Sequence, residues 1–297
     1  MKSPIALEYY IVDVFTDTAL QGNGLAVVSD TIGLSTERMQ AIAREFNLSE
    51  TTFIQRRDSS LERKEGVRVR IFTTQEELPF AGHPTLGTAS VLKLNMPEVL
   101  DGDTIRLALK VGAVPVRFNR DSLFGEMTQR DPEFGHQLDT AEVARLCGLH
   151  LDHLNAAVPP QVVSTGTAFA IVALRSHEFL AELRVDQEPA NRYLREHGGR
   201  WFYVMGPTSS DNSGWRARMQ FYGGEDPATG SAAGCAISYL VAHKIVPAGA
   251  QIHVRQGVEI GRASDLFLAA DIVEGRVTNV RVAGSTVPVA KGTIFLP

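Results

Sequence analysis

The chain has 297 residues, a length typical of about two domains. It carries 29 Lys and Arg against 34 Asp and Glu, a formal net charge of −5, and 44% of its residues are hydrophobic. This composition excludes a mostly disordered chain, which needs fewer apolar residues and more net charge. The chain also lacks the basic footprint of a nucleic-acid-binding protein, so we expect no nucleic-acid partner.

The cysteines and the apolar stretches bear on where the protein resides. Two cysteines, Cys147 and Cys235, are too few for a disulfide framework. No apolar stretch approaches the length of about 18 residues that a membrane-spanning helix needs. Glu8 and Asp13 interrupt the N-terminal region where a signal peptide would have its apolar core. We therefore expect a cytoplasmic protein that does not associate with membranes.

Alternating apolar and polar residues predict strands along much of the chain. The clearest are residues 8–15, 66–73, 105–118 and 215–221. Near the C-terminus, residues 266–273 and 276–282 are expected to form a hairpin around the turn Glu274-Gly275.

Helices are fewer. Residues 36–46 repeat apolar side chains at helical spacing, with Ser35 as a capping residue and Asn47 as a stop. Residues 139–147 begin with a capping-box spacing. Two further helices, rich in small residues, are expected to follow Gly-rich loops: residues 84–94 and 231–243.

The two Gly-rich loops, LPFAGHPTLGTA (78–89) and GEDPATGSAAG (224–234), form a weak internal repeat. Each follows an alternating strand and begins a small-residue helix, and they lie about half a chain apart. The repeat predicts two similar halves. Because strands and helices do not alternate regularly, the order of elements favours an α+β fold over a doubly wound one.

Several common catalytic motifs are missing from the sequence. It has no P-loop, no dinucleotide-binding Gly motif before a helix, no C-x-x-C and no G-x-S-x-G. His150 and His153 lack the further ligands of a zinc site, so we expect no metal. Cys235 is expected to be a small core residue.

Two acid–base residues lie in the first half. Glu50 follows a helix and enters an apolar strand. It is either a surface charge, which spacing alone favours, or a buried carboxylate whose raised pKa suits acid–base work. His83 lies between Gly82 and Pro84. It is either a histidine in a surface turn or a polariser or proton shuttle held by a rigid turn.

The second half offers Asp226 just before a helix that begins near Gly230 and Ser231. Asp226 either caps a turn or contributes an acid to a site. The backbone N–H groups at the start of this helix can hold a carboxylate, aided by the helix dipole. If both helix starts faced one cleft, they could grip a small anion.

At these residues the chain resembles the PhzF family of phenazine-biosynthesis-like proteins. The matching segments are VDVFTDTALQGNGLAVV (12–28), AREFNLSETTFI (43–54), RIFTTQEELPFAGHPTLGTA (70–89), EDPATGSAAG (225–234) and QGVEIGR (256–262). The resemblance implies a diaminopimelate epimerase-like fold of two pseudo-symmetric halves, each a curled, barrel-like sheet around a central helix. A linker expected near residues 120–131 gives an N-terminal half at 1–125 and a C-terminal half at 126–285. The resemblance implies that a C-terminal strand at about 286–297 returns to the first half. It also implies a homodimer.

The best-known activity of this family is the cofactor-free isomerisation of trans-2,3-dihydro-3-hydroxyanthranilate. Carried over by motif, Glu50 would take the proton from C3 of the ring and return one to C1. His83 and Asp226 would position the substrate and assist proton transfer. A further set would bind the substrate carboxylate: Gly82, Gly230 and Ser231.

Three departures and two alternatives qualify this implication. The chain has no cysteine at either loop, which disfavours a two-thiol racemase mechanism like that of diaminopimelate epimerase. Residues 164–169 lack the basic side chains of the phenazine enzyme, and residues 220–224 form a shorter stretch than usual. The alternatives are an epimerase or racemase of an amino-acid-like substrate, and a non-catalytic protein that binds a small acid.

Overall fold

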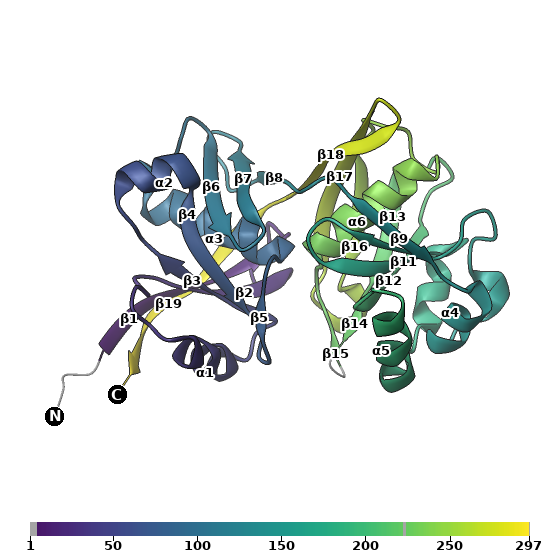
Figure 1. Cartoon of the computed structure of the whole chain (residues 1–297), viewed down its shortest axis with the longest axis horizontal. Coiled ribbons are helices and arrows are strands. Elements are labelled where there is room, and N and C mark those ends of the chain that lie inside the picture. Colours follow the sequence, from purple (N-terminus) through teal and green to yellow (C-terminus); the bar gives the residue numbers. More distant parts are fainter. Residues whose placement is uncertain (1–4, 222–223, 297) are drawn as a thin grey trace. The chain divides into compact units, whose positions relative to one another are not determined.

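The computed structural model describes residues 5–221 and 224–296, and it has a mixed α+β fold (Figure 1). Tyr222 and Gly223, part of the shortened stretch 220–224, lie outside the described residues. The chain divides into two compact units. The first is Met1–Met127 with Gly284–Pro297, and the second is Thr128–Ala283. Each unit is a curled, mostly antiparallel sheet around one central helix, which confirms the predicted fold class.

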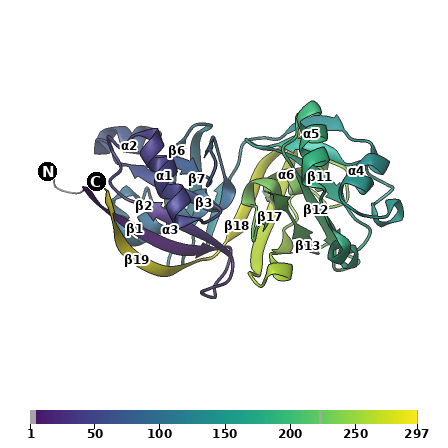
Figure 2. The ribbon, with the colours of Figure 1, turned by 90° about the horizontal axis from the view of Figure 1, so that it is seen from below.

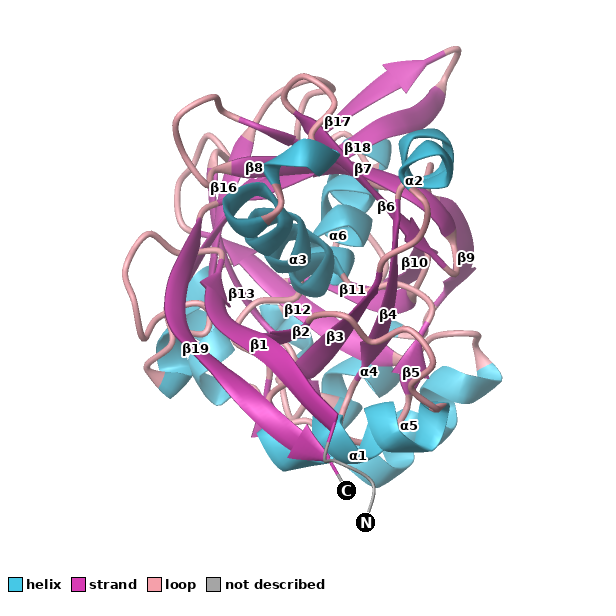
Figure 3. Ribbon diagram, turned by 90° about the vertical axis from the view of Figure 1, so that its left-hand side faces the viewer, coloured by secondary structure: helices cyan, strands magenta, loops and turns pink. Residues whose placement is uncertain are grey.

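The first unit builds its sheet around α3 (Gly82–Asn95), as Figure 3 shows. Its strands lie in the order β19, β1, β2, β3, β4, β6, β7, β8, and only the pairs β2–β3 and β4–β6 are parallel. The bounds are β1 (Ile5–Val14), β2 (Asn23–Val28), β3 (Glu50–Gln55), β4 (Val67–Phe72), β5 (Glu77–Leu78), β6 (Thr104–Leu109), β7 (Gly112–Phe118), β8 (Gly125–Thr128) and β19 (Thr286–Leu296).

The sheet of the first unit is covered on both faces, which explains why every residue of β3 is buried. Thr52 contacts Thr88 of α3, with 2.8 Å between the two Oγ1 atoms. The next residue, Phe53, points to the opposite face and packs against α1 (Thr36–Phe46). Because α3 is buried from Gly82 to Leu92, its small residues are needed for the strands to close around it.

The second unit repeats this arrangement around α6 (Gly230–Ala242), as Figure 1 shows. Its strands lie in the order β9, β10, β11, β12, β13, β16, β17, β18, and only β11–β12 and β13–β16 are parallel. The parallel pairs fall at the same places as in the first unit, so the weak sequence repeat corresponds to a structural repeat. The bounds are β9 (Glu133–Gln137), β10 (Gln161–Ser164), β11 (Ala168–Ala173), β12 (Trp201–Pro207), β13 (Gly214–Arg218), β16 (Ile252–Gln256), β17 (Ser264–Val273) and β18 (Arg276–Gly284).

The outermost strand at one side of each sheet directly follows the last strand of the other unit along the chain. In the first unit, β19 pairs with β1 over most of its length, and Figure 2 shows the two strands side by side. In the second unit, β9 pairs with β10. The chain enters β19 directly after β18 and enters β9 directly after β8. Each sheet therefore receives this strand from the segment that follows the last strand of the other repeat.

The four predicted helices are confirmed, and most of their ends differ from the predicted ends by one or two residues. α1 has the predicted bounds, and Ser35 accepts a hydrogen bond from the N–H of Arg38. The structure adds two helices that the sequence patterns did not predict, α2 (Ser59–Glu65) and α5 (Gln187–Glu196). The predicted helix at 139–147 is α4 (Thr140–Leu146), and two short strands are β14 (Gln220–Phe221) and β15 (Gly224–Glu225). Four short 3-10 helices complete the elements of the described residues: η1 (Pro97–Val99), η2 (Leu151–His153), η3 (His177–Glu182) and η4 (Val258–Ile260). Of the described residues, no helix is both long and apolar enough to cross a membrane.

Candidate active site

Glu50 and His83 form a buried acid–base pair in the first unit. Glu50 is the first residue of β3 and points to the same face as Thr52, toward α3. His83 is the second residue of α3, and its Nε2 lies 3.3 Å from Oε2 of Glu50. The exposed fractions are 9% for Glu50 and 2% for His83. The surface alternatives for both residues are therefore wrong.

A third buried residue, Asn23, joins this pair. It is the first residue of β2, and its Nδ2 lies 3.1 Å from Nδ1 of His83. Burial lowers the pKa of His83 to about 3, so the imidazole is neutral near pH 7. Sequence reasoning missed Asn23 as a site residue, although it lies in the segment GNG within the first matching stretch.

The start of α3 supplies backbone donors next to this pair. Gly82 is the first residue of the helix, and Ala81 before it has no side chain that could cap the helix. The first N–H groups of a helix have no partner within the helix. Those of Gly82 and His83 therefore lie at the positive end of the helix dipole, where an anion is stabilised.

Asp226 belongs to a buried polar network in the second unit. Thr229 donates its hydroxyl to Oδ2 of Asp226 at 2.7 Å. The amide of Gln256 donates to the Asp226 carbonyl at 2.8 Å and to the Thr229 hydroxyl at 2.9 Å. Tyr203 donates to Oε1 of Gln256 at 3.2 Å. Burial and, secondly, the nearby charge of Asp226 raise the pKa of Tyr203, which keeps this donor protonated.

This network holds the loop that precedes α6, where Gly230 and Ser231 are the first two helical residues. Gln129 reinforces it from another side, since its amide donates to the carbonyl of Gly230 at 2.9 Å. Thr165 in turn donates to Oε1 of Gln129 at 2.6 Å. Thr165 lies in the stretch 164–169 that departs from the phenazine enzyme, so this departure reaches the start of α6.

The predicted site residues thus fall into two clusters. Glu50, His83 and Gly82 lie together in the first unit. In the second unit, Asp226 lies in the network that precedes Gly230 and Ser231 at the start of α6. Sequence reasoning missed the buried amides of Asn23, Gln129 and Gln256. Asn23 and Gln256 lie in segments that match the family, but their roles could not be predicted locally, because all three amides contact partners that are distant in the sequence.

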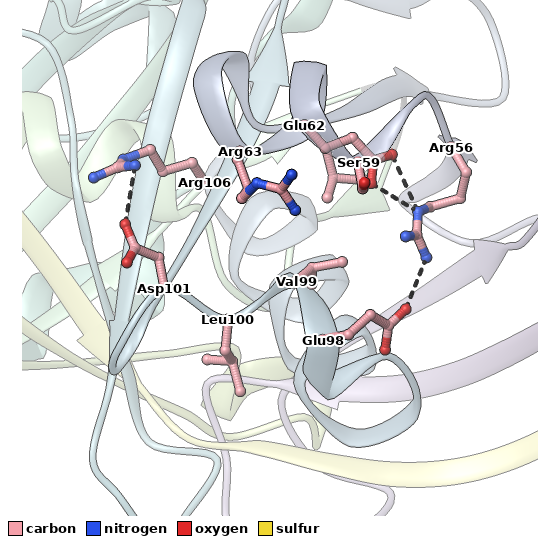
Figure 4. A pocket seen from close by; sticks show the side chains of 10 residues that line it. Arg56, Ser59, Glu62, Arg63, Glu98, Val99, Leu100, Asp101 and Arg106 are labelled. Carbon is pink, nitrogen blue, oxygen red and sulfur yellow. Dashed lines mark hydrogen bonds and ion pairs between the residues drawn. The ribbon is translucent and has the colours of Figure 1, made fainter.

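Figure 4 shows a separate pocket of the first unit, whose lining does not include Glu50. It includes Arg56, just beyond the last residue of β3, whereas Glu50 begins that strand. A strand of six residues spans roughly 17–20 Å, so this pocket is remote from the acid–base pair. Most of its charged side chains form ion pairs with one another: Arg56 with Glu62 and Glu98, and Arg106 with Asp101.

The other candidates from the sequence have structural roles. His153 stacks on Phe179, with 4.1 Å between ring centroids. Across residues 5–221 and 224–296, no three His, Cys, Asp or Glu side chains are grouped so as to hold a metal ion. Cys235 is fully buried in α6, as predicted, and burial raises its pKa to about 11. The thiol is therefore protonated and a poor nucleophile.

Comparison with known proteins adds independent evidence. Residues 12–292 match the family model described as PhzC-PhzF, phenazine biosynthesis-like protein. A trans-2,3-dihydro-3-hydroxyanthranilate isomerase from Pseudomonas aeruginosa is 37% identical over 296 residues, covering 97% of this chain and 99% of that protein.

Solved structures agree with this match. The structure of a predicted epimerase from Pseudomonas aeruginosa is 31% identical, with a TM-score of 0.82, and covers 97% of this chain and 99% of that one. A hydroxyproline epimerase from Agrobacterium vitis, 13% identical with a TM-score of 0.66, covers 99% of this chain and 92% of that one and shares the fold. The chain therefore belongs to the PhzC-PhzF family of phenazine biosynthesis-like proteins and is an isomerase of that family.

Proposed function

We propose that this protein moves a proton within a small carboxylate substrate, without a cofactor, and that trans-2,3-dihydro-3-hydroxyanthranilate or a related compound is that substrate. The observation that carries the proposal is the buried Glu50–His83 pair at the start of α3. The relative from Pseudomonas aeruginosa that bears this substrate's name supports the choice of compound.

The proposed reaction breaks one C–H bond and forms another. The carboxylate of Glu50 takes the proton from C3 of the ring, and the resulting carboxylic acid delivers a proton to C1. No electrons are gained or lost, so the step needs no oxidant or reductant. A positioned acid–base group contributes typically about 10²–10⁴-fold to such a step, and orientation and fixed dipoles supply the rest.

We assign the second cluster to binding the carboxylate end of the substrate. In this proposal, Asp226 assists proton transfer and positions the substrate. The first N–H groups of α6, at Gly230 and Ser231, and that of Gly82 in α3 hold the substrate carboxylate. The support is that neither central helix has a side-chain cap, because Ala81 precedes α3 and the Thr229 hydroxyl is directed to Asp226. The family resemblance is our ground for also proposing a homodimer located in the cytoplasm.

A second candidate is an epimerase or racemase of an amino-acid-like substrate. It is favoured by the similarity to the structure titled as a predicted epimerase. Such an enzyme would also exchange a carbon-bound proton with solvent, but it would invert a stereocentre without moving a double bond. The structure of the product therefore distinguishes the two candidates.

The test is proton NMR in D₂O with trans-2,3-dihydro-3-hydroxyanthranilate. We expect turnover with deuterium at the newly protonated carbon. Glu50→Gln should reduce turnover by at least about 10²-fold, because an amide cannot accept the proton, while calorimetry still detects binding. Glu45→Gln, on the exposed side of α1, is the matched control and should retain activity.

Each other result has a definite meaning. Turnover that survives in Glu50→Gln would refute Glu50 as the base. Binding without turnover by the unaltered protein would favour a protein that only binds a small acid. Inversion of an amino-acid stereocentre, with no turnover of the ring compound, would favour the epimerase.

A further inference from the structure

The contact between Asn23 and His83 restricts where the imidazole can carry its proton. Asn23 is 1% exposed, and its Nδ2 lies 3.1 Å from Nδ1 of His83. An amide nitrogen can only donate a hydrogen bond, so Nδ1 must be the acceptor. In a neutral imidazole one nitrogen carries the hydrogen, and here it must be Nε2.

The opposite side of the ring is compatible with the same tautomer. Nε2 lies 3.3 Å from Oε2 of Glu50, although the two atoms are not aligned as a hydrogen bond in this structure. A carboxylate oxygen that carries no hydrogen can only accept, so a hydrogen on Nε2 suits this contact. One tautomer therefore suits both neighbours. The other would set Nδ1–H against the amide N–H of Asn23, and the lone pair of Nε2 against the oxygen of Glu50.

The sheet makes this arrangement rigid. β2 and β3 run parallel, with Leu25 opposite Glu50, so Asn23 and Glu50 lie at the same end of neighbouring strands. Leu25 points toward α3, where its side chain packs close to Gly87. Asn23, two residues earlier, points to the same face and reaches the first turn of that helix.

We propose that Asn23 is a positioning residue that fixes His83 as its Nε2–H tautomer, so that the neutral ring presents this hydrogen toward Glu50 and does not act as a proton relay. A relay through the ring would have to pass a proton between Nδ1 and its neighbour. The amide of Asn23 can neither take up nor supply one. The importance of this arrangement for catalysis rests on the proposed function of Glu50 as the base.

The tautomer can be measured without any substrate. Long-range ¹H–¹⁵N NMR on protein labelled at histidine distinguishes a protonated ring nitrogen from an unprotonated one, and the signals lost in His83→Gln identify His83. We expect Nε2 protonated and Nδ1 unprotonated, with no change between about pH 8 and about pH 5. A spectrum with Nδ1 protonated, or with both nitrogens protonated in this range, would overturn the proposal.

The decisive variant is Asn23→Asp, which has nearly the same shape but offers only acceptors. We expect it to shift the hydrogen of His83 to Nδ1 and to lower kcat by roughly 10²- to 10⁴-fold with little change in KM. Losses of this size follow when a catalytic histidine loses its orienting partner or takes the wrong tautomer. Asn119→Asp, the same change at an exposed position of the first unit, should alter neither readout.

The two readouts separate this proposal from the proposed function. Loss of activity in Asn23→Asp with an unchanged His83 tautomer would refute the positioning role and indicate a structural one. If Asn23→Asp does not fold, the spectrum of the unaltered protein still decides the tautomer. If the spectrum shows the expected tautomer but the ring compound is not turned over, the proposed substrate is contradicted and the assignment of the His83 tautomer stands.

Discussion

Gly257 provides a sharp test of how the loop of Asp226 is held in place. Its φ of +74° lies in the left-handed region, and a Cβ there would lie 2.6 Å from the carbonyl oxygen of Pro227, next to Asp226. It would be closer still to the carbonyl oxygen of Arg262. Gly261 ends the same short turn with φ of +69°, and a Cβ there would have no neighbour within 4 Å. Alanine at either position therefore meets the same backbone strain, but only at Gly257 does it meet a collision.

The expected magnitudes follow from this difference. Left-handed backbone costs a residue other than glycine about 1–2 kcal/mol, and this is the whole effect expected for Gly261→Ala. Gly257→Ala must also displace two backbone carbonyl groups, which adds about 1–3 kcal/mol. For a unit of this size, each kcal/mol lowers the unfolding temperature by roughly 2–4 °C.

Tryptophan fluorescence during urea unfolding is a suitable assay, because the chain has two tryptophans, Trp201 and Trp215, and both lie buried in the second unit. We expect a lower midpoint for Gly257→Ala than for Gly261→Ala. We also expect a larger loss of kcat/KM, because Pro227 adjoins Asp226. Equal midpoints for the two variants would refute the reasoning that close packing behind this loop limits its position.

Two further predictions concern charge. Burial holds the pKa of His83 near 3, below the 6.5 of an exposed histidine, so only the unfolded chain gains this proton as the pH falls from about 6.5. The free energy of unfolding should therefore fall by up to about 1.4 kcal/mol per pH unit between pH 6.5 and 3. Urea unfolding followed by circular dichroism at several pH values should show that this free energy depends less steeply on pH in His83→Gln. The ion pair of Arg218 and Glu225 leaves these side chains only 8% and 6% exposed, so Glu225→Gln should destabilise the protein by about 3–5 kcal/mol. Glu142→Gln, which breaks an exposed pair, should change little, and similar losses in both variants would contradict this prediction.

Elements whose ends are fixed by local contacts were predictable from the sequence. Ser35 and Asn47 bound α1 through a side-chain cap and a left-handed residue, and both act within a few positions. The hairpin turn at Glu274-Gly275 depends in the same way on two residues with positive φ. α5 was missed because only Ala190 and Leu194 are buried in it, which is too few for a clear helical period.

The site was predictable only in part, and the reason is again the range of the contacts. Glu50 and His83 lie in segments with recognisable motifs. The spacing around Glu50 favoured a surface position, because its neighbours along the chain do not reveal that α3 packs over the strand. Asn23 and His83 are 60 positions apart and meet only because β2, β3 and α3 share one face of the sheet.

The placement of β19 bears on the order in which a newly made chain can fold. Before Thr286–Leu296 has been synthesised, β1 has β2 on one side but lacks the partner that it finally acquires on the other. The second unit receives β9 much earlier, so its sheet can be completed while the first still presents an open strand edge. Such an edge can pair with other chains. Domains generally fold from the N-terminus during synthesis, whereas here the first unit must wait longest and is the one most in need of protection on the ribosome.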